Sequence, residues 1–423
     1  MLEINTIRTQ TEMVKDGLRK KNFKEIELVD EILKVDEQRK KTQLTLDELR
    51  NKENLLAKEI GELFKQGKKE EADKKKEEGG LLKVDSAKLT EVLNRLEEEQ
   101  KNLLVILPNL PTAIVPEGKT PEENITVKQV GEIPVLPETA LPHWDLAKKY
   151  NLFDLELGVK LTGAGFPVFK GKGAKLQRAL AAFFLDNATE AGYTEVIPPY
   201  MVNEASAFGT GQLPDKEGQM YHATEDNFFL IPTAEVPVTN IHRDEILEEK
   251  DLPIKMTAYS PCFRREAGSY GKDVRGLNRV HQFEKVEIVQ LQHPDKSYQT
   301  LDEMVAYVET LLQKLELPYR ILQLCGGDMS FSSALTYDFE VWSAAQKRWL
   351  EVSSVSNFET FQTNRMKIRY RDENKKTKLL HSLNGSALAL PRIYASILEN
   401  HQTPEGIKIP KLLQPYTGFE LLN

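Results

Sequence analysis

The sequence contains little cysteine, with two such residues among 423. Cys262 and Cys325 cannot form a disulfide framework, and no cluster of cysteine and histidine has the spacing of a zinc site. No segment approaches the run of about 18 apolar residues that a membrane-spanning helix needs, and the N-terminal segment lacks the apolar stretch of a secretory signal. These absences favour a soluble protein in a reducing compartment. We therefore expect a cytoplasmic location and no membrane partner.

An excess of positive charge is also missing. Lysine and arginine number 57 against 65 acidic residues, and the net charge is -8. The chain as a whole is therefore not suited to bind a polyanion, and any contact with nucleic acid must depend on a local patch. One candidate is the segment 65–76, which contains six lysines and three acidic residues. The same composition is typical of a solvated turn between two helices.

The glycine-rich loops that mark many ATP sites are absent as well. The segment GAGFPVFKGKGAK, residues 163–175, contains glycine and lysine in the wrong spacing. Five residues rather than four separate Gly165 from Gly171, and Lys172 is followed by glycine rather than by serine or threonine. We interpret these glycines as a turn into a helix. Any phosphate site must then use other groups.

A long heptad pattern is present instead. Apolar residues from Leu28 to Leu63 recur in alternating steps of four and three, and a second series runs from Leu82 to Leu107. The polar stretch between them predicts an antiparallel pair of helices over residues 28–107, joined near residues 66–70. The first helix would be about 50 Å long. Glycines 79 and 80 predict a bend or fraying in the second helix. Four polar residues at core positions are expected to fix the register of the pair: Arg39, Glu53, Ser86 and Gln100.

The heptad pattern ends in the segment LPNLPTAIVPEGKTPEEN, whose prolines exclude a continuous helix. We therefore expect a helical arm over residues 1–110 and a second domain over residues 111–423. The second domain mixes strand-like and helical segments without strict alternation, which predicts an α+β fold with an antiparallel sheet. The expected strands include residues 195–197, 228–231, 286–291 and 337–342, and the expected helices include residues 174–191, 298–315 and 387–400.

One segment of the second domain, CFRREAGSYGKDVRGLNRVHQFEKVEI, carries many charges of both signs. If residues 263–266 form a strand, Arg264 and Glu266 share one face. The chain then passes through a loop and returns with a second set of side chains on one face: His281, Phe283, Lys285 and Glu287. A planar guanidinium suits a phosphate, and an aromatic ring beside it can stack on a purine. A surface hairpin held by salt bridges explains the charge equally well, so the residues alone leave both interpretations open.

This segment resembles motif 2 of the class II aminoacyl-tRNA synthetases, in the version found in seryl-tRNA synthetases. AGYTEVIPPYMVN, residues 191–203, resembles motif 1 with Pro199 as its proline, and LNGSALALPR, residues 383–392, resembles motif 3. Three shorter segments resemble signatures of the serine enzymes: TGQLP, LIPTAEVP and LEVSSVSN. The N-terminal helical pair also matches the tRNA-binding arm of this family. The likeness therefore covers essentially the whole chain.

The resemblance implies a catalytic domain built on a six-stranded antiparallel sheet flanked by helices. It also implies a homodimer formed largely through motif 1. The implied reaction is that of a serine–tRNA ligase, in which L-serine and ATP give seryl-adenylate and pyrophosphate. The seryl group then moves to the 3′ end of tRNA(Ser). Whether the selenocysteine tRNA, tRNA(Sec), is also served is left open by the sequence.

The resemblance also implies roles in binding ATP and magnesium. Arg264 would hold the α-phosphate and Arg392 the γ-phosphate, and these two are the expected catalytic residues. Glu266 would meet the adenine amino group, and Phe283 would stack on the base. Mg²⁺ would be held by Glu351 and Ser354, and the other implied ATP-binding residues are Arg265, Val352 and Ser353.

Two physical points bear on these roles. Strand alternation places Glu351 on the same face as Ser353, so a metal site that includes Ser354 requires a β-bulge or a strand end. The carboxylate of serine is ionised near neutral pH and needs no general base. Catalysis should then depend on positioning and on stabilisation of the charge that builds on the α-phosphate, supplied by Arg264 and magnesium.

The resemblance nominates a serine pocket made of Thr233, Ala234, Glu235, Glu287 and Ser386. Its two carboxylates can accept hydrogen bonds from the ammonium and the hydroxyl of serine, but spacing does not decide which does which. A site that hydrogen-bonds the hydroxyl can reject an analogue without it by ~10⁴-fold. The alternative for Glu287 is a salt bridge with Lys285 or an arginine.

In the same family, the helical arm grips the long extra arm of the tRNA through its backbone. We therefore expect tRNA contacts from the lysines near the tip, namely Lys68, Lys69, Lys74, Lys75 and Lys76. Three residues are expected to be structural: His281, Cys262 and Cys325. Asp338 and Glu340 share one face of a predicted strand near the site.

The chain departs from the family pattern at two positions. Asn364 stands where the family tends to have arginine, which puts in doubt a contact with tRNA or across the dimer. Arg265 replaces a small residue but should face away from ATP. Two rivals are an amino acid–carrier protein ligase, which would lack the arm, and a non-catalytic RNA-binding adaptor, which would be expected to lose Arg264, Glu266 or Arg392.

Overall fold

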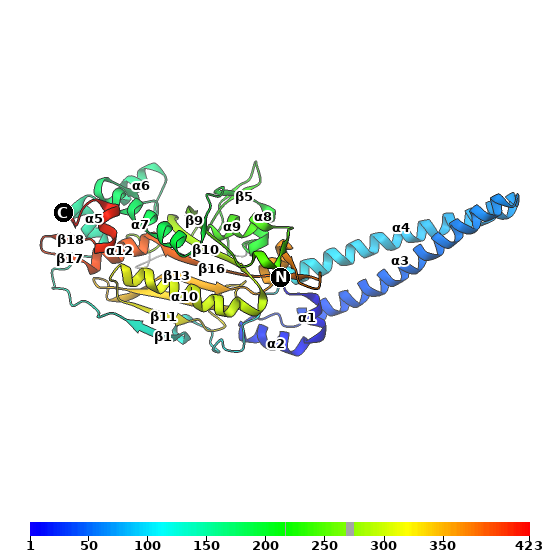
Figure 1. Ribbon diagram of the computed structural model, residues 1–423, viewed down its shortest axis with the longest axis horizontal. Coiled ribbons are helices and arrows are strands. Elements are labelled where there is room, and N and C mark those ends of the chain that lie inside the picture. Colours follow the sequence, from blue (N-terminus) through cyan, green and yellow to red (C-terminus); the bar gives the residue numbers. More distant parts are fainter. Residues whose placement is uncertain (216, 268–274) are drawn as a thin grey trace. The chain divides into compact units, whose positions relative to one another are not determined.

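A computed structural model describes residues 1–215, 217–267 and 275–423 of the chain. The chain divides into two compact units, one made of residues 1–19 and 23–108 and the other of residues 20–22 and 109–423 (Figure 1). In the described part of the chain, no helix combines the length and apolar character needed to cross a lipid bilayer.

The first unit is built on two long helices, α3 (Leu28–Lys65) and α4 (Lys69–Ile106), which pack against each other in antiparallel directions (Figure 1). Two short helices, α1 (Ile4–Thr9) and α2 (Thr11–Lys20), precede them. The apolar heptad residues Ile32, Leu46 and Leu93 are buried, and the turn falls at residues 66–68. The predicted helical pair is therefore confirmed.

Polar residues cross-link the two helices at the predicted core positions. Ser86 donates a hydrogen bond to Glu53, and Gln100 Nε2 donates to Asp36 Oδ1 over 2.9 Å. The predicted fraying at glycines 79 and 80 is wrong, because α4 continues through both residues. A Cβ at Gly79 would lie 3.4 Å from Leu56 Cδ2, so this part of α4 packs closely on α3.

The second unit is built on an eight-stranded sheet with the order β1-β11-β12-β13-β16-β10-β9-β4. Its six central strands are antiparallel to one another, as expected for the antiparallel sheet, and one further strand at each edge enlarges the expected six strands to eight. They are β11 (Tyr319–Gln323), β12 (Leu335–Ser343), β13 (Arg348–Asn357), β16 (His381–Ala389), β10 (Gln282–Gln292) and β9 (Ile254–Phe263). Strand β1 (Ile125–Val130) extends one edge in antiparallel pairing, and β4 (Thr194–Glu195) extends the other in parallel pairing.

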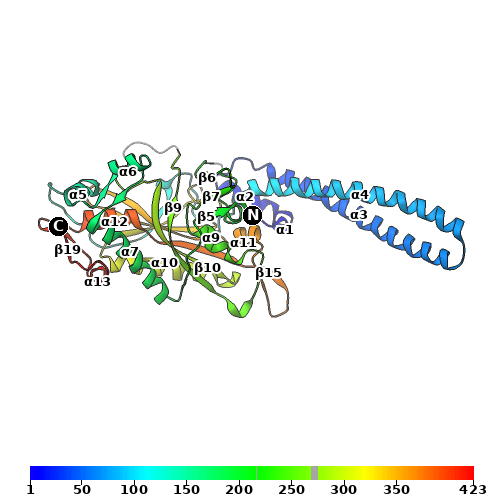
Figure 2. The same cartoon turned by 90° about the horizontal axis from the view of Figure 1, so that it is seen from above.

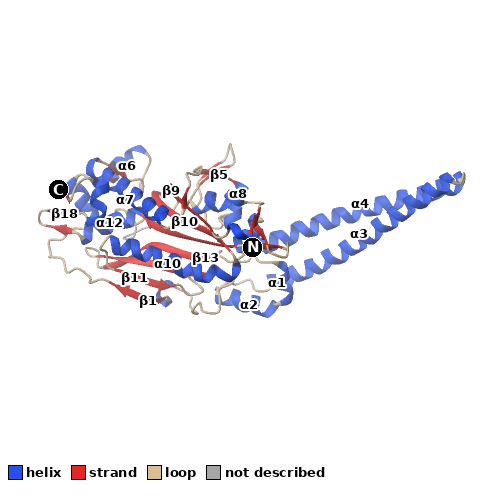
Figure 3. Ribbon diagram, in the orientation of Figure 1, coloured by secondary structure: helices blue, strands red, loops and turns tan. Residues whose placement is uncertain are grey.

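Three helices pack on the sheet: α7 (Gly171–Glu190), α10 (Ser297–Lys314) and α12 (Leu390–Asn400) (Figures 2 and 3). The core between them contains Phe184, Ile288 and Leu398, all fully buried. Helix α12 begins three residues after the predicted start at 387, because residues 387–389 are still part of β16. Pro391 lies in the first turn of α12, where proline is favoured.

Along β10 the side chains alternate between the two faces of the sheet. Val286 and Ile288 belong to the core, whereas Phe283, Lys285 and Glu287 line a cavity. Residues 228–231 were expected to be a strand, and β7 (Phe228–Leu230) lies in a separate small sheet with β5 (Met201–Asn203) and β6 (His222–Ala223).

The remaining helices and strands surround the sheet. They are α5 (His143–Tyr150), β2 (Phe153–Asp154), α6 (Leu155–Leu161), β3 (Val168–Phe169), α8 (Glu204–Thr210), α9 (Glu235–Thr239), β8 (Ile246–Glu248), α11 (Phe361–Met366), β14 (Arg369–Arg371), β15 (Thr377–Leu379), β17 (Gln402–Thr403), β18 (Gly406–Lys408), α13 (Gln414–Thr417) and β19 (Leu421–Leu422).

Candidate active site

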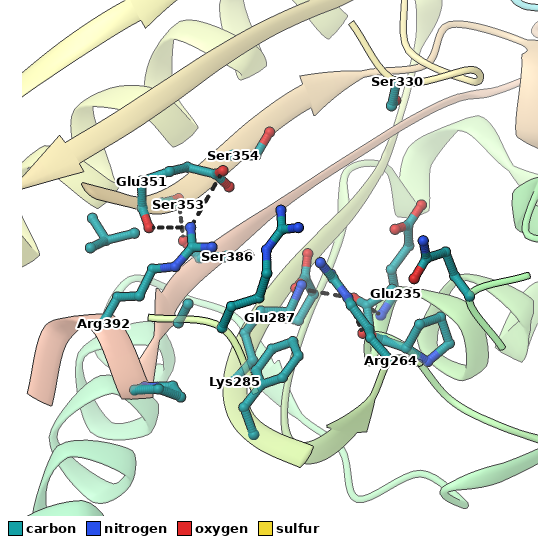
Figure 4. Close-up of a pocket in the computed structure, with 18 of the residues that line it drawn as sticks. Glu235, Arg264, Lys285, Glu287, Ser330, Glu351, Ser353, Ser354, Ser386 and Arg392 are labelled. Carbon is teal, nitrogen blue, oxygen red and sulfur yellow. Dashed lines mark hydrogen bonds and ion pairs between the residues drawn. The ribbon is translucent and has the colours of Figure 1, made fainter. Parts of the chain in front are cut away.

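A cavity of about 660 Å³ is lined by residues of β10, β13 and β16, the start of α9 and the start of α12 (Figure 4). Most of the residues predicted for the site contribute to it. They are Thr233, Glu235, Arg264, Glu266, Phe283, Glu287, Glu351, Val352, Ser353, Ser354, Ser386 and Arg392. Ala234 and Arg265 are the predicted residues, among those described, that do not line it. Segments separated by more than a hundred residues therefore meet in one cavity.

Arg264 lies at one side of the cavity (Figure 4). Its Nε donates a hydrogen bond to the carbonyl oxygen of Pro232 over 3.3 Å, and its guanidinium carbon lies 5.2 Å from the ring centroid of Phe283. An arginine at this distance from an aromatic face is held by a cation–π interaction. The cation and the ring predicted to bind nucleotide are therefore adjacent.

The strand expected over residues 263–266 is wrong beyond its first residue, because β9 ends at Phe263. Glu266 adopts a left-handed backbone conformation, with φ of 48°. Glu266 nevertheless lines the cavity, and its carboxylate pairs with Arg279, whose Nε lies 3.4 Å from Glu266 Oε2. The loop expected to pass through Gly268 and Gly271 lies outside the described residues.

Arg392 lies at the other side of the cavity, in the first turn of α12 (Figure 4). Its Nε donates to the carbonyl oxygen of Asn278 over 3.0 Å, and its Nη1 donates to the carbonyl oxygen of Glu351 over 2.7 Å. The Glu351 carboxylate lies 3.5 Å from the same Nη1. The orientation of this guanidinium is thus fixed by two backbone acceptors and a charge.

A β-bulge in β13 resolves the conflict over the metal site. Ser353 pairs with Phe339, but Glu351 pairs with Glu340, so Val352 is an extra residue in this strand. The bulge that the predicted set of Glu351 and Ser354 requires is therefore present.

The acidic side chains around this bulge fit a divalent cation. Asp338 pairs with Ser354 in the sheet, and its pKa is raised well above the usual range by burial and by the Glu351 carboxylate. Among the described residues, Asp338 Oδ1 has no hydrogen-bond partner. A cation would relieve this repulsion, and an all-oxygen donor set suits Mg²⁺. The described residues contain no group of three or more metal-ligating side chains, as is usual where Mg²⁺ is held by one or two carboxylates together with phosphates.

The predicted serine pocket centres on Glu287, which is 2% exposed. Glu287 forms an ion pair with Lys285, and its Oε2 accepts a hydrogen bond from Thr233 Oγ1 over 3.4 Å. The alternative salt bridge is therefore present, but it lies inside the cavity rather than on a surface hairpin. Ser386 is the partner of Glu287 in the pairing of β10 with β16.

Glu235 lies at the start of α9, and no cation among the described residues forms an ion pair with it, although the charge of Lys285 acts on it from a greater distance. Its Oε1 accepts a hydrogen bond from Gln362 Nε2 over 2.6 Å. Burial and the negative charge of Glu287 raise the pKa of Glu235 to about 6. The two carboxylates of the pocket are thus electrostatically unequal.

Sequence reasoning missed several residues of the cavity. Lys285 was placed on the correct face but was considered only as an alternative salt-bridge partner of Glu287. Asn278 and Arg279 lie in the motif 2 segment, so their position could have suggested them. Gln212 lies in the TGQLP signature and Asn384 in motif 3, so the same holds for them, whereas Ser330 and Ser332 come from a segment without a recognisable pattern.

The residues predicted to be structural make contacts typical of that role. His281 Nδ1 lies 3.0 Å from the carbonyl oxygen of Arg264, and its ring stacks on Phe166 with centroids 5.5 Å apart. Cys262 and Cys325 are buried and unpaired with each other. Asn364 lies in α11 and is half-buried.

The lysines predicted to contact tRNA lie at and after the turn between α3 and α4. Lys68, Lys69, Lys74 and Lys76 are exposed, whereas Lys75 is half-buried and forms an ion pair with Glu59 of α3. The five lysines therefore differ in how far their charge is available to a ligand.

Two family descriptions match separate parts of the chain. Residues 219–401, which hold most of the cavity, match the tRNA synthetase class II core domain (G, H, P, S and T). The fold and the site thus define a class II aminoacyl-tRNA synthetase. Residues 1–111 match the seryl-tRNA synthetase N-terminal domain.

Relatives that match over nearly their whole length identify the family within this class. The serine–tRNA ligase of Salinibacter ruber is 52% identical and covers 99% of this chain and 98% of its own, and that of Chlorobaculum parvum is 47% identical over 100% of both. The chain belongs to the seryl-tRNA synthetase family.

Solved structures agree with this assignment. The seryl-tRNA synthetase of Pyrococcus horikoshii complexed with ATP has a TM-score of 0.93 and 35% identity, covering 100% of this chain and 99% of its own. The cytoplasmic serine–tRNA ligase of Naegleria fowleri in complex with AMP has a TM-score of 0.88 and 28% identity, with the same coverage.

Proposed function

We propose that this chain is an ATP-dependent serine–tRNA ligase. It activates L-serine to seryl-adenylate and transfers the seryl group to the 3′ end of tRNA(Ser). Family membership over the whole length supports the reaction. The observation that carries the proposal is that Arg264, Arg392 and the acidic pair Glu235 and Glu287 all line one cavity.

In this proposal ATP lies between the two arginines. Arg264 holds the α-phosphate, Arg392 holds the γ-phosphate, and Phe283 stacks on the adenine whose amino group meets Glu266. The Arg264 guanidinium lies over the Phe283 ring in the structure, so adenine must use the other ring face or displace this side chain. The ATP complex of the Pyrococcus horikoshii relative supports the nature of the ligand.

The chemical step needs no protein base. A carboxylate oxygen of serine attacks the α-phosphorus, a new P–O bond forms, and the bond from the α-phosphorus to the bridging oxygen of pyrophosphate breaks. Arg264 stabilises the charge that develops on the α-phosphate oxygens. Glu351 and Ser354 would hold Mg²⁺, which neutralises phosphate charge when it is bound. Adjacent residues Val352 and Ser353 shape the same wall of the cavity.

The electrostatic difference between the two carboxylates suggests their roles. Glu287 already has the ammonium of Lys285 as its counter-ion, whereas Glu235 lies beside a carboxylate and has a raised pKa. The ammonium of serine supplies the positive charge that Glu235 lacks. Glu287, with Ser386 across the sheet and Thr233 beside it, then accepts from the serine hydroxyl.

Two assemblies complete the proposal. The exposed lysines at the tip of the α3–α4 pair bind the backbone of the tRNA.

The motif 1 region and the segments next to it present apolar side chains to solvent, with Ile197 82% exposed and Ile241 45% exposed. Such apolar exposure supports burial in a homodimer. The two unpaired cysteines fit a cytoplasmic location.

Amino-acid-dependent exchange of ATP with pyrophosphate tests the reaction and its specificity together. The assay is run in parallel with serine, threonine and alanine. Exchange that depends on serine and exceeds the other two by at least about a hundredfold is expected. Equal exchange with threonine or alanine, or none with serine, would overturn the proposal. Charging assays with tRNA(Ser) and tRNA(Sec) then define the acceptor.

A further inference from the structure

We propose that a buried pair, His143 and Glu399, positions the Arg392 side of the cavity. The pair holds Leu277 and Asn278, and Asn278 in turn orients Arg392. The identity of the ligand there as a triphosphate depends on the proposed function. The positioning itself depends only on hydrogen bonds that link α5, α12 and the segment after the motif 2 loop.

His143 and Glu399 are both fully buried and lie 256 residues apart in the chain. Glu399 Oε1 lies 2.7 Å from His143 Nδ1 and accepts a hydrogen bond from the backbone amide of His143 over 3.0 Å. Ser343 donates to the other carboxylate oxygen. Burial by itself would raise the pKa of Glu399, but the hydrogen bonds from His143 and Ser343 lower it below the usual value. The carboxylate is therefore held in its charged form.

The far side of the imidazole contacts the motif 2 segment. The backbone amide of Leu277 donates to His143 Nε2 over 2.8 Å. Because Nε2 accepts this bond, the ring proton resides on Nδ1, where it is donated to Glu399. The Glu399 carboxylate thus selects the tautomer that can receive Leu277.

Gly276 makes this contact possible. Its φ is 63°, and a Cβ at this position would lie 2.1 Å from His143 Nε2. Neither the backbone conformation nor the space permits a side chain here. The segment therefore packs directly on the imidazole, and Leu277 beside it is 1% exposed.

Gln346 forms a second link from Glu399 to the same segment. Its Nε2 lies 3.2 Å from Glu399 Oε1, and its Oε1 accepts from Asn278 Nδ2 over 2.8 Å. The carbonyl oxygen of Asn278 accepts the 3.0 Å bond from Arg392 Nε. Leu277, Asn278 and Arg392 line the cavity, whereas His143, Gln346 and Glu399 lie behind it. The network therefore holds Arg392, which would contact the ligand, in a fixed orientation. Such support from buried residues is typical of a preorganised site.

The decisive variant is Gln346→Ala, which removes the link to Asn278 without cutting the fully buried pair. Its matched control is Gln402→Ala. Gln402 is also half-buried and bonds the backbone of Glu399 over 2.9 Å, but its other hydrogen bonds go to Leu141. Both variants lose hydrogen bonds near Glu399, and Gln346→Ala is the one that loosens Asn278.

Titration calorimetry of the full chain with ATP and with AMP separates positioning from general damage. Loss of the Gln346 side-chain hydrogen bonds to Asn278 and Glu399 should weaken ATP binding by roughly fivefold in Gln346→Ala, and AMP binding by less than about twofold. In exchange assays KM for ATP should rise while KM for serine stays within about twofold. Gln402→Ala should leave the ATP and AMP affinities unchanged.

A pair of substitutions at Glu399 gives a second test. Glu399→Gln keeps an acceptor for the Nδ1 proton, so it should retain the ratio of ATP to AMP affinity, and Glu399→Leu should lose it. The proposal is overturned if Gln346→Ala and Gln402→Ala weaken both nucleotides equally, or if Gln346→Ala leaves ATP binding unchanged. If the parent chain binds ATP but shows no serine-dependent exchange, the proposed function fails while the nucleotide comparison still decides the positioning role.

Discussion

The hydrogen bond from Gln362 to Glu235 should set the pH at which serine activation fails. Glu235 has a pKa raised to about 6 by burial and by the charge of Glu287, and the bond from Gln362 opposes that rise. Gln362 is fully buried and is itself held, since its Nε2 also donates to the Thr210 carbonyl oxygen over 3.1 Å and its Oε1 accepts from Ser382 Oγ over 2.8 Å. It cannot turn away from Glu235 without losing these partners.

The sign of the pH effect follows from the proposed role of Glu235. The ionised carboxylate binds the ammonium of serine, so kcat/KM for serine should fall as pH decreases through about 6. A hydrogen bond to a charged group contributes about 1.5–3 kcal/mol, and about 1.4 kcal/mol corresponds to one pKa unit. Gln362→Leu should therefore shift the acidic limb of the kcat/KM–pH profile to higher pH by roughly one pH unit.

The assay is serine-dependent ATP/pyrophosphate exchange, with kcat/KM measured from about pH 5 to about pH 9. Ser382→Ala, which removes the support of Gln362 but not its amide, should shift the limb in the same direction by less. Identical acidic limbs in the parent chain and in Gln362→Leu would refute the reasoning. So would a uniform loss across the whole pH range, because that would indicate a structural role alone.

Three further predictions concern other parts of the site. Glu351→Gln should raise the Mg²⁺ concentration needed for half-maximal exchange by roughly tenfold, whereas Glu340→Gln, its partner in the sheet, should change it less. Glu287→Gln should raise KM for serine and reduce discrimination against alanine by at least about tenfold, measured in the same exchange assay; unchanged discrimination would contradict the assignment of the hydroxyl to Glu287. Replacing the exposed tip lysines with alanine should weaken tRNA binding by roughly tenfold or more with a shallower salt dependence, while exchange without tRNA is unaffected; Lys75→Ala alone should have a smaller effect because Lys75 is paired with Glu59. The lysines replaced together are Lys68, Lys69, Lys74 and Lys76.

Some elements were predictable because they depend on local periodicity. The heptad pattern specified α3 and α4 almost to their ends, since burial of one stripe on each helix requires that spacing. The fraying expected at Gly79 did not occur, because that residue packs closely on Leu56 of α3, which is a tertiary contact. Helix propensity is a weak preference, and packing between two long helices overrides it.

The candidate site was predictable as a set of residues but not as an arrangement. The resemblance to the family nominated Arg264, Arg392 and Glu351, and strand alternation placed Phe283 and Glu287 on the correct face. The bulge at Val352 could be stated as a requirement, but strand pairing decides where it occurs. The ion pair of Lys285 with Glu287 could be named as an alternative, but its place inside the cavity could not, and the hydrogen bond of Gln362 to Glu235 has no signal in the sequence.

The sequence by itself therefore determined the helical arm, the class of the catalytic domain and the groups that can contact serine and ATP, because periodicity and motif chemistry are local properties. Only the tertiary structure decided which carboxylate has a counter-ion, how Arg392 is held through Asn278, and that His143 and Glu399 lie behind the cavity. Those relations join residues far apart in the chain, and they exist only once the strands have paired and the helices have packed on the sheet.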